Sequence, residues 1–240
     1  MGVADFFTYG SVLSTDYGVH IYDGDVFSAP TRDVTYLSVP GRSGALIIDN
    51  GRWNNRTLKY QAVIDAAFID RFDSFRAALA AASESGYVRL TDTVHPGEFR
   101  KALFVGAMTP TVNGLSHSGT FEIEFNCQPQ RWLVSGETAT SVSSGQTITN
   151  PTGFASKPLI RVSGSGAGTL TVGSTTVSLN TLDDYLYLDC EEMNVYRQTA
   201  ENRNAYMNAG NFPVLEPGVN TISFAGGISA IEITPRWFVL

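Results

Sequence analysis

The sequence predicts a mainly β protein with two domains and a single α-helix. Segments rich in β-branched and aromatic residues recur along the 240 residues, and Gly, Pro, Asn and Asp separate them. Only residues 70–84 place their apolar side chains at helical spacing. Residues 134–149 are rich in Ser, Thr and Gly and show no periodicity. We therefore expect one domain over residues 1–133 and a second over residues 134–240.

The most informative segment of the first domain lies between residues 40 and 64. Residues 45–48 and 57–64 are rich in strand-forming residues, and Asn50 and Gly51 stand between them. Asn and Gly tolerate the positive φ angles that both central residues of a type I′ turn require. We therefore expect a β-hairpin, an arm, whose turn is formed by Asn50 and Gly51.

This arm is expected to carry apolar side chains on both faces. Because successive strand residues point to opposite faces, Leu46 and Ile48 would share one face and Ile47 would lie on the other. A lone two-stranded hairpin of this kind is marginally stable in water. Either its own domain covers it or a neighbouring subunit does, and the residue pattern leaves both alternatives open.

The remaining elements of the first domain are one helix and several strands. The helix is expected to begin after Asp70, whose carboxylate can cap it, and to end at Ser85-Gly86. Its apolar face consists of Phe72, Phe75, Leu79 and Ala82. Strands are expected at residues 17–22, 34–39, 87–90, 99–105 and 120–127.

The second domain is expected to be a β-sandwich of the jelly-roll type, built from many short antiparallel strands. The glycine-rich segment 164–168 resembles a phosphate-binding loop, but its spacing is wrong and no helix follows it. We interpret it as a turn between strands. The expected strands are residues 158–163, 169–172, 175–179, 185–188, 193–197, 219–224 and 230–234.

The charge of the chain argues against nucleic-acid binding. The 16 Lys and Arg residues are outnumbered by 23 Asp and Glu, the net charge is -7, and the basic residues form no patch. Membrane insertion is not expected, because the longest apolar run, residues 77–82, is far shorter than the ~20 residues of a membrane-spanning helix. The first residues lack the features of a secretion signal, so we expect synthesis in a cytoplasm.

No pattern of reactive residues predicts an enzyme, a cofactor or a metal site. His20, His95 and His117 are scattered, and no zinc or calcium motif is present. The acidic pairs 183–184 and 191–192 lie at the ends of expected strands, and adjacent side chains on a strand point to opposite faces, so neither pair forms a site alone. Cys127 and Cys190 each end an alternating strand pattern, and we expect buried thiols.

Three blocks of sequence resemble the distal tail (Dit) proteins of siphophages, which are hub proteins of the tail baseplate. They occur in the order and at the spacing of that family: GRSGALIIDNGRWNNRTLKYQAVI at residues 41–64, FEIEFNCQPQRWL at 121–133 and FPVLEPGVNTISFAGGISAIEITPRWFVL at 212–240. The resemblance implies a split-barrel-like N-terminal β-sandwich with one helix and a projecting arm. It also implies a galectin-like sandwich at the C-terminus.

In function, the resemblance implies a hexameric ring at the tip of a long non-contractile tail in the virion. The ring would join the major tail protein to a tail-associated lysin or fibre protein, after assembly in the bacterial cytoplasm. The arm would wrap the next copy, which accounts for two apolar faces. The residues expected to make or shape this contact are Leu46, Ile48, Asn50, Gly51, Trp53 and Tyr60.

An alternative function is a carbohydrate-binding module for host adhesion, because jelly-roll sandwiches often carry sugar sites lined by aromatic residues. The available side chains are Tyr185, Tyr187, Tyr196 and Tyr206. However, Tyr185 and Tyr187 would share a strand face at period two, as core residues also do. An enzyme built on the sandwich is a third possibility, for which the sequence offers no catalytic site.

Overall fold

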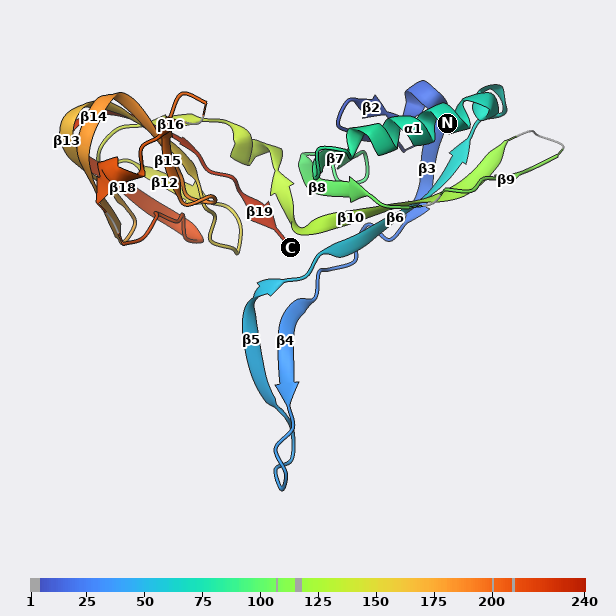
Figure 1. Cartoon of the computed structure of the whole chain (residues 1–240), viewed down its shortest axis with the longest axis horizontal. Helices are drawn as coiled ribbons and strands as arrows, with labels where there is room; N and C mark the ends of the chain where they lie inside the picture. Colours follow the sequence, from blue (N-terminus) through green and yellow to red (C-terminus); the bar gives the residue numbers. More distant parts are fainter. Residues whose placement is uncertain (1–4, 107, 115–117, 200, 209) are drawn as a thin grey trace. The chain divides into compact units, whose positions relative to one another are not determined.

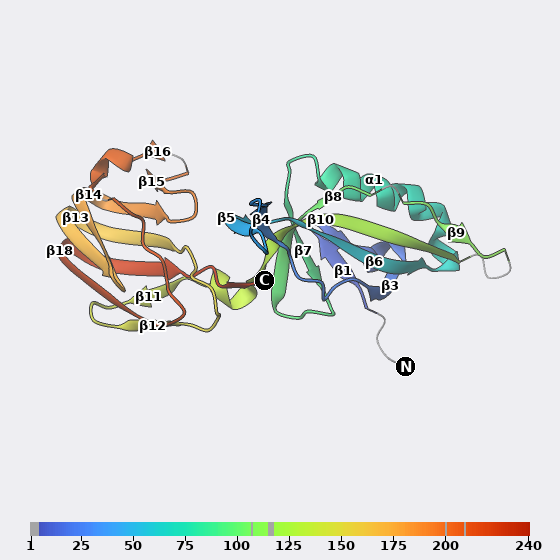
Figure 2. The same ribbon diagram turned by 90° about the horizontal axis from the view of Figure 1, so that it is seen from below.

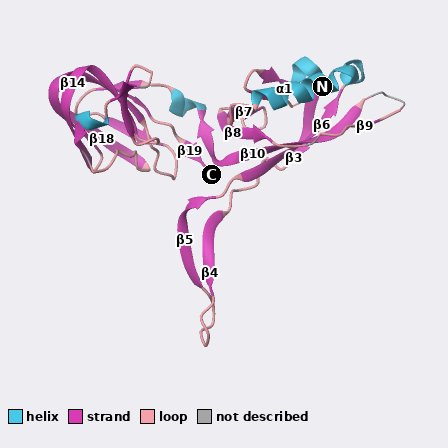
Figure 3. Ribbon diagram, in the orientation of Figure 1, coloured by secondary structure: helices cyan, strands magenta, loops and turns pink. Residues whose placement is uncertain are grey.

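The computed structural model describes residues 5–106, 108–114, 118–199, 201–208 and 210–240. The chain forms two compact units, Met1–Arg131 with Leu240, and Trp132–Val239. Both consist mainly of antiparallel strands (Figure 3), and the described residues contain one α-helix, α1 at Phe72–Ala82. The predicted mainly β fold class is therefore confirmed.

Unit 1 is built on an antiparallel sheet whose strands follow the order β2-β1-β7-β8-β10-β6-β3, with β9 paired to β10. Short 3-10 helices lie at Ser14–Tyr17 and Ala66–Arg71. The strands are β1 Phe7–Tyr9, β2 Val12–Leu13, β3 Val19–Gly24, β6 Arg56–Ile64, β7 Val88–Asp92, β8 Glu98–Phe104, β9 Thr111–Val112 and β10 Gly119–Leu133.

Helix α1 covers one face of this sheet (Figures 1 and 2). Phe72, Phe75 and Leu79 are buried on the sheet side, as their helical spacing predicts. The predicted cap is wrong, because a 3-10 helix runs directly into α1 and places Arg71, rather than Asp70, at the capping position. The helix ends at Ala82, and Gly86 follows in the next turn with a φ of 100°.

The arm of unit 1 consists of β4 Arg32–Leu37 and β5 Leu46–Trp53, which form a separate two-stranded sheet (Figure 1). The predicted hairpin is wrong in its partner strand, because β5 pairs with β4 and not with β6. Strand β6 lies between β10 and β3 in the main sheet instead. Its alternate residues are fully buried apolar or aromatic side chains, so this face belongs in the core: Leu58, Tyr60, Ala62 and Ile64.

The predicted turn at Asn50 and Gly51 is also wrong, because both residues lie inside β5. The register shifts there, so that residues 50–52 of β5 stand opposite Asp33 alone. Gly51 has a φ of 73°. Glycine is favoured both in bulges and in tight turns, because both often require positive φ. The Asn50-Gly51 pair is therefore compatible with either structure, and the pair alone does not distinguish them.

Unit 2 is a curled antiparallel sheet in the order β11-β18-β13-β14-β15-β16, with β12 paired to β18 and β17 to β14. Further 3-10 helices lie at Val134–Glu137 and Asn204–Tyr206. The strands are β11 Thr140–Val142, β12 Thr147–Asn150, β13 Leu159–Val172, β14 Thr175–Asp189, β15 Asn194–Arg197, β16 Glu201–Asn202, β17 Met207–Asn208, β18 Gly218–Thr234 and β19 Phe238–Val239.

Strands β13, β14 and β18 are long, and each joins two of the predicted short strands. The predicted turn at residues 164–168 is wrong, because β13 continues through it with shifts in register. The glycines permit close strand contact at these shifts. A Cβ atom on Gly164 would lie 2.0 Å from the carbonyl oxygen of Gly227.

Each unit has its own hydrophobic core, and one cysteine lies in each. Cys127 and Cys190 are both free thiols and both buried, as predicted. Burial raises the pKa of Cys127 to about 11 and that of Cys190 to about 12. Among the helices of the described ranges, none is both long and apolar enough to span a membrane.

Candidate interaction surface

The outer half of the arm exposes apolar side chains on both of its faces, as predicted. Tyr36 stands opposite Ile47 on one face, and these side chains are 67% and 65% exposed. Leu37 stands opposite Leu46 on the other face, which also carries the exposed Ile48. A two-stranded ribbon has no third layer that could cover these groups. The arm therefore presents apolar surface that its own fold leaves in water.

The inner half of the arm is held together by charged side chains. The Arg32 guanidinium donates to the Asp49 carboxylate at 3.0 Å, and Arg52 donates to Asp33 at 2.6 Å. Asn50 also donates to Asp33, at 2.9 Å. The hydrogen bonds from Asn50 and Arg52 hold the pKa of Asp33 below its usual value, and those from Arg32 and Gly51 do the same for Asp49. The charged groups of the inner half are therefore paired within the arm, and the exposed apolar side chains that a partner could cover lie in the outer half.

Trp53 and Tyr60, both predicted to make inter-subunit contacts, differ in where they lie. Trp53 is half-buried at the inner end of the arm, with the Arg32 guanidinium 5.3 Å from its ring centroid. Tyr60 is not on the arm and is wholly buried in the core of unit 1. Its ring stacks on Phe7 at 5.5 Å. The prediction for Tyr60 as a surface contact is therefore wrong, because β6 belongs to the main sheet.

The segment that leads into the arm, residues 25–28, is held by two buried arginines. We call it the root loop. Arg56 donates to the carbonyl oxygens of Ser28 and Asp25, the latter at 2.9 Å, and Arg100 donates to that of Val26 at 3.4 Å. Burial, and next the positive charge of Arg100, lowers the pKa of Arg56. The two guanidiniums together bind three of the four carbonyl oxygens of the root loop, and this fixes where the arm begins.

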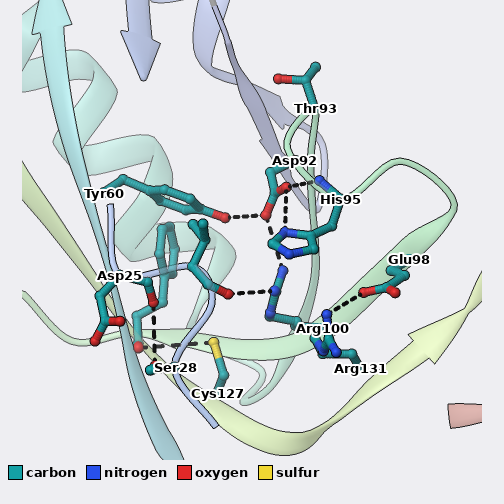
Figure 4. Close-up of polar contacts among 12 residues, drawn as sticks. Asp25, Ser28, Tyr60, Asp92, Thr93, His95, Glu98, Arg100, Cys127 and Arg131 are labelled. Carbon is teal, nitrogen blue, oxygen red and sulfur yellow. Dashed lines mark hydrogen bonds and ion pairs between the residues drawn. The ribbon is translucent and has the colours of Figure 1, made fainter. Parts of the chain in front are cut away.

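Asp92 supplies the buried negative charge of this network (Figure 4). Its carboxylate accepts hydrogen bonds from Tyr60 at 2.6 Å and from Arg100 at 3.0 Å. The backbone N–H of His95 donates to the same carboxylate at 2.7 Å. Burial, and next the Asp92 charge, raises the pKa of Tyr60 well above its ordinary value, so the hydroxyl remains a donor.

Known structures share this fold. The Dit protein (gp 19.1) of SPP1, described as a paradigm of the hub adsorption apparatus of phages that infect Gram-positive bacteria, matches with a TM-score of 0.76. The match covers 99% of this chain and 100% of that chain at 15% identity. The chain has the fold of SPP1 Dit. The resemblance seen in the sequence is thus confirmed at the level of the fold.

Two structures of the phage P2 baseplate in its activated conformation, one with Ca and one with Sr, give weaker matches. Their TM-scores are 0.53 and 0.50 at 10% and 11% identity, over 97% of this chain and 98% of theirs. No protein-family model and no curated protein sequence matches the chain. The likeness to SPP1 Dit and to the P2 baseplate is therefore one of three-dimensional structure.

The tyrosines considered for sugar binding mostly come together on unit 2 of this Dit-like fold. Tyr187 stacks on Tyr196 at 5.3 Å and meets the edge of Tyr185 at 5.7 Å. The guanidinium of Arg161 lies over the Tyr185 ring at 4.8 Å. Tyr206 lies apart from them, beneath the guanidinium of Arg203. The three grouped rings pack against one another and against a cation, so local packing accounts for the cluster.

The described part of the chain holds no group of three or more His, Cys, Asp or Glu residues that could bind a metal ion. His117 lies outside the described residues. Two features were not predicted from the sequence: the contribution of β4 to the arm, and the network of Arg56, Asp92 and Arg100. A strand was expected at residues 34–39 from its strand-forming residues, but nothing local indicated its pairing with residues 46–53, and no sequence pattern indicated the buried charges.

Proposed function

We propose that this protein is a structural subunit of a phage tail hub, with an architectural rather than a catalytic role. In this proposal, copies of the chain form a hexameric ring at the distal tip of a long non-contractile tail. Unit 1 builds the ring, and each arm lies on the next copy. The ring connects the major tail protein to the tail-associated lysin or fibre protein.

The observation that carries this proposal is the full-length likeness to SPP1 Dit, which extends over both units rather than one. The arm provides independent support. Burying apolar surface stabilises an assembly by about 25 cal/mol per Å², and the outer half of the arm has such surface on both faces. In a closed ring each further contact is intramolecular in effect, so a modest interface per copy is sufficient.

The test is the solution mass of the purified chain by light scattering over a range of concentrations and salt levels. We expect a closed ring, or a ring in exchange with the monomer of 25.9 kDa. The variant Ile47→Asp should shift this equilibrium toward monomer. Ile47 is exposed in the single chain but is expected to be buried in the ring, where a charge at this position would lose its hydration.

Val219→Asp is the matched control, because Val219 is 70% exposed and lies in unit 2. It introduces the same charge and should leave the mass distribution unchanged. A monomer at every concentration would contradict self-assembly. Assembly of Ile47→Asp at the level of the unaltered chain, with native circular dichroism, would remove the arm from the interface.

A further inference from the structure

Unit 1 has a small cavity beside the root loop. Its volume is about 180 Å³, and it is lined by Ile21, Tyr22, Val26, Tyr60 and Val94, among others. This volume is below the roughly 300–1,000 Å³ of sites for small-molecule ligands. The cavity is therefore large enough to hold one or two apolar side chains of a protein partner, and small for a typical small-molecule ligand.

Two aromatic side chains mark the rim of this cavity. Phe27 is 79% exposed and Tyr22 is 61% exposed, although both are large apolar groups. Phe27 is nevertheless held in place, because its ring meets the edge of His95 at 5.1 Å and the backbone on each side of it is bound by Arg56. A rigid, exposed aromatic side chain beside a small apolar cavity is typical of an interface anchor.

The rim is also acidic. Asp5 and Asp23 line the cavity and are exposed. Asp5 accepts a hydrogen bond from the Thr93 hydroxyl, and Asp23 accepts one from the Gly24 N–H, so both carboxylates face neutral donors. Within the described residues, neither carboxylate takes part in an ion pair that the structure contains. A partner with an apolar anchor and a cation would complement this site.

The outer end of the arm has this combination. Tyr36 and Ile47 form an exposed apolar pair on one face, and the connection from residue 38 to residue 45 carries Arg42 as its charged residue. An arm cannot reach the cavity at its own root. The six residues of β4 place Leu37 about 17 Å from Arg32, at about 3.3 Å for each of the five steps, and pairing with β5 keeps the ribbon extended. The arm that fits must come from a second copy.

We propose that the root cavity of one copy receives the arm of the next, with Tyr36 and Ile47 against Phe27 and Tyr22, and Arg42 against Asp5 and Asp23. This inference rests on the proposed ring and names the surface that receives the arm. The contact joins two different surfaces of the same chain. Such a head-to-tail contact builds a ring when its rotation closes.

The test mixes two variants, each with one half of the contact removed. Ile47→Asp disables the arm, and Phe27→Asp disables the cavity rim, while both replaced side chains are mostly exposed and so are dispensable for folding. Each variant alone should associate at least about tenfold more weakly than the unaltered chain, because each loses an anchor. In the mixture, the intact arm of the Phe27→Asp variant can still enter the intact cavity of the Ile47→Asp variant. The expected product is a heterodimer that grows no further.

A charge exchange provides a second measurement. Arg42→Glu should weaken assembly about tenfold by placing like charges together, and adding Asp23→Lys to the same chain should restore it to within about threefold. Val219→Asp is again the control for an added charge. Restoration requires that the two positions face each other, so a merely structural effect of either change would not produce it.

The outcomes separate this inference from the proposed function. A heterodimer in the mixture, together with charge rescue, supports arm-to-cavity docking. If Ile47→Asp abolishes assembly while Phe27→Asp assembles normally, the arm binds elsewhere and only this inference is overturned. If both variants assemble like the unaltered chain, the arm is not the ring contact and the proposed function loses its interface as well.

Discussion

At the residue scale, the charged groups inside unit 1 are the most sensitive positions. Arg100 and Asp92 are almost fully withdrawn from water, and each is the other's ionic partner. A buried ion is tolerated only while a counter-charge and hydrogen bonds replace its hydration. The network therefore positions the root loop only as long as all of its members are present.

Asp92→Asn should destabilise unit 1 by about 3–5 kcal/mol, because Arg100 would remain buried without a counter-charge. Urea unfolding followed by fluorescence measures this loss. Asp73→Asn is the matched control. Its carboxylate pairs with Arg76 but is 84% exposed, so the change should cost less than about 1 kcal/mol. Equal midpoints for the two variants would show that the buried pair contributes nothing special.

A second residue-scale prediction concerns acid and unit 2. Burial alone would raise the pKa of Asp189, but hydrogen bonds from Arg236, at 2.6 and 2.9 Å, and from the Glu192 N–H outweigh it and hold the pKa below its ordinary value. The folded state therefore favours the ionised carboxylate. This contribution to stability is present above the unfolded pKa of about 3.9 and is lost as the pH falls through the lower folded value.

Asp189→Asn should accordingly flatten the fall in unit 2 stability as the pH drops from about 5 to about 3. Urea midpoints measured at several pH values provide the readout. Asp183→Asn removes a carboxylate that is 76% exposed, and the acid dependence should persist in that variant. An unchanged pH profile in Asp189→Asn would contradict the assignment.

At the element scale, glycines allow strands β13 and β18 to bend together. A Cβ atom on Gly227 would lie 1.9 Å from the carbonyl oxygen of Ser165, which is far inside van der Waals contact. A flexible side chain could move away from such a clash, but the backbone of a paired strand cannot do so without breaking its pairing. The bend consequently depends on glycine at this position rather than on a general preference for a turn.

Gly227→Ala should destabilise unit 2 by about 3 kcal/mol or more, since relieving the overlap requires the paired strands to separate. Thermal unfolding measures the effect. Gly153→Ala makes the same chemical change where no atom lies within 4 Å of the new Cβ, and it should change stability by less than about 1 kcal/mol. Similar melting curves for both variants would rule out the steric explanation.

At the scale of the whole molecule, each unit contains its own core, and the arm belongs to unit 1. A unit with a separate core can fold by itself. If assembly uses the arm, the ability to associate should follow unit 1 and be absent from unit 2.

A fragment of residues 1–133 should therefore fold and associate with the concentration dependence of the full chain, whereas residues 134–240 should fold as a monomer. Circular dichroism checks that each fragment is folded, and light scattering gives its mass. A monomeric N-terminal fragment beside an associating C-terminal fragment would move the interface to unit 2.

Local patterns were sufficient for much of the fold. The spacing of Phe72, Phe75 and Leu79 predicts both the helix and its buried face, and alternation predicts the two apolar faces of the arm. These properties depend on residues that are only a few positions apart in the sequence. They could be read without knowing where the rest of the chain lies.

The strand partners could not be read in this way. Asn50-Gly51 satisfies a bulge as well as a turn, and only the pairing of β5 with β4 distinguishes the two. Likewise, the glycine segment of β13 differs from a turn only because β18 lies against it. Both errors concern the same ambiguity, since positive φ and a missing Cβ serve either structure.

Backbone preference and side-chain periodicity are local, so the mainly β class, the position of the helix and the apolar character of the arm could be predicted from the residues alone. Three features became visible only in the folded chain: the burial of Tyr60, the pairing of Asp92 with Arg100 next to the root loop, and the small acidic-rimmed cavity beside Phe27. Those features depend on contacts between residues far apart in the chain, and such contacts exist only once the strands have paired.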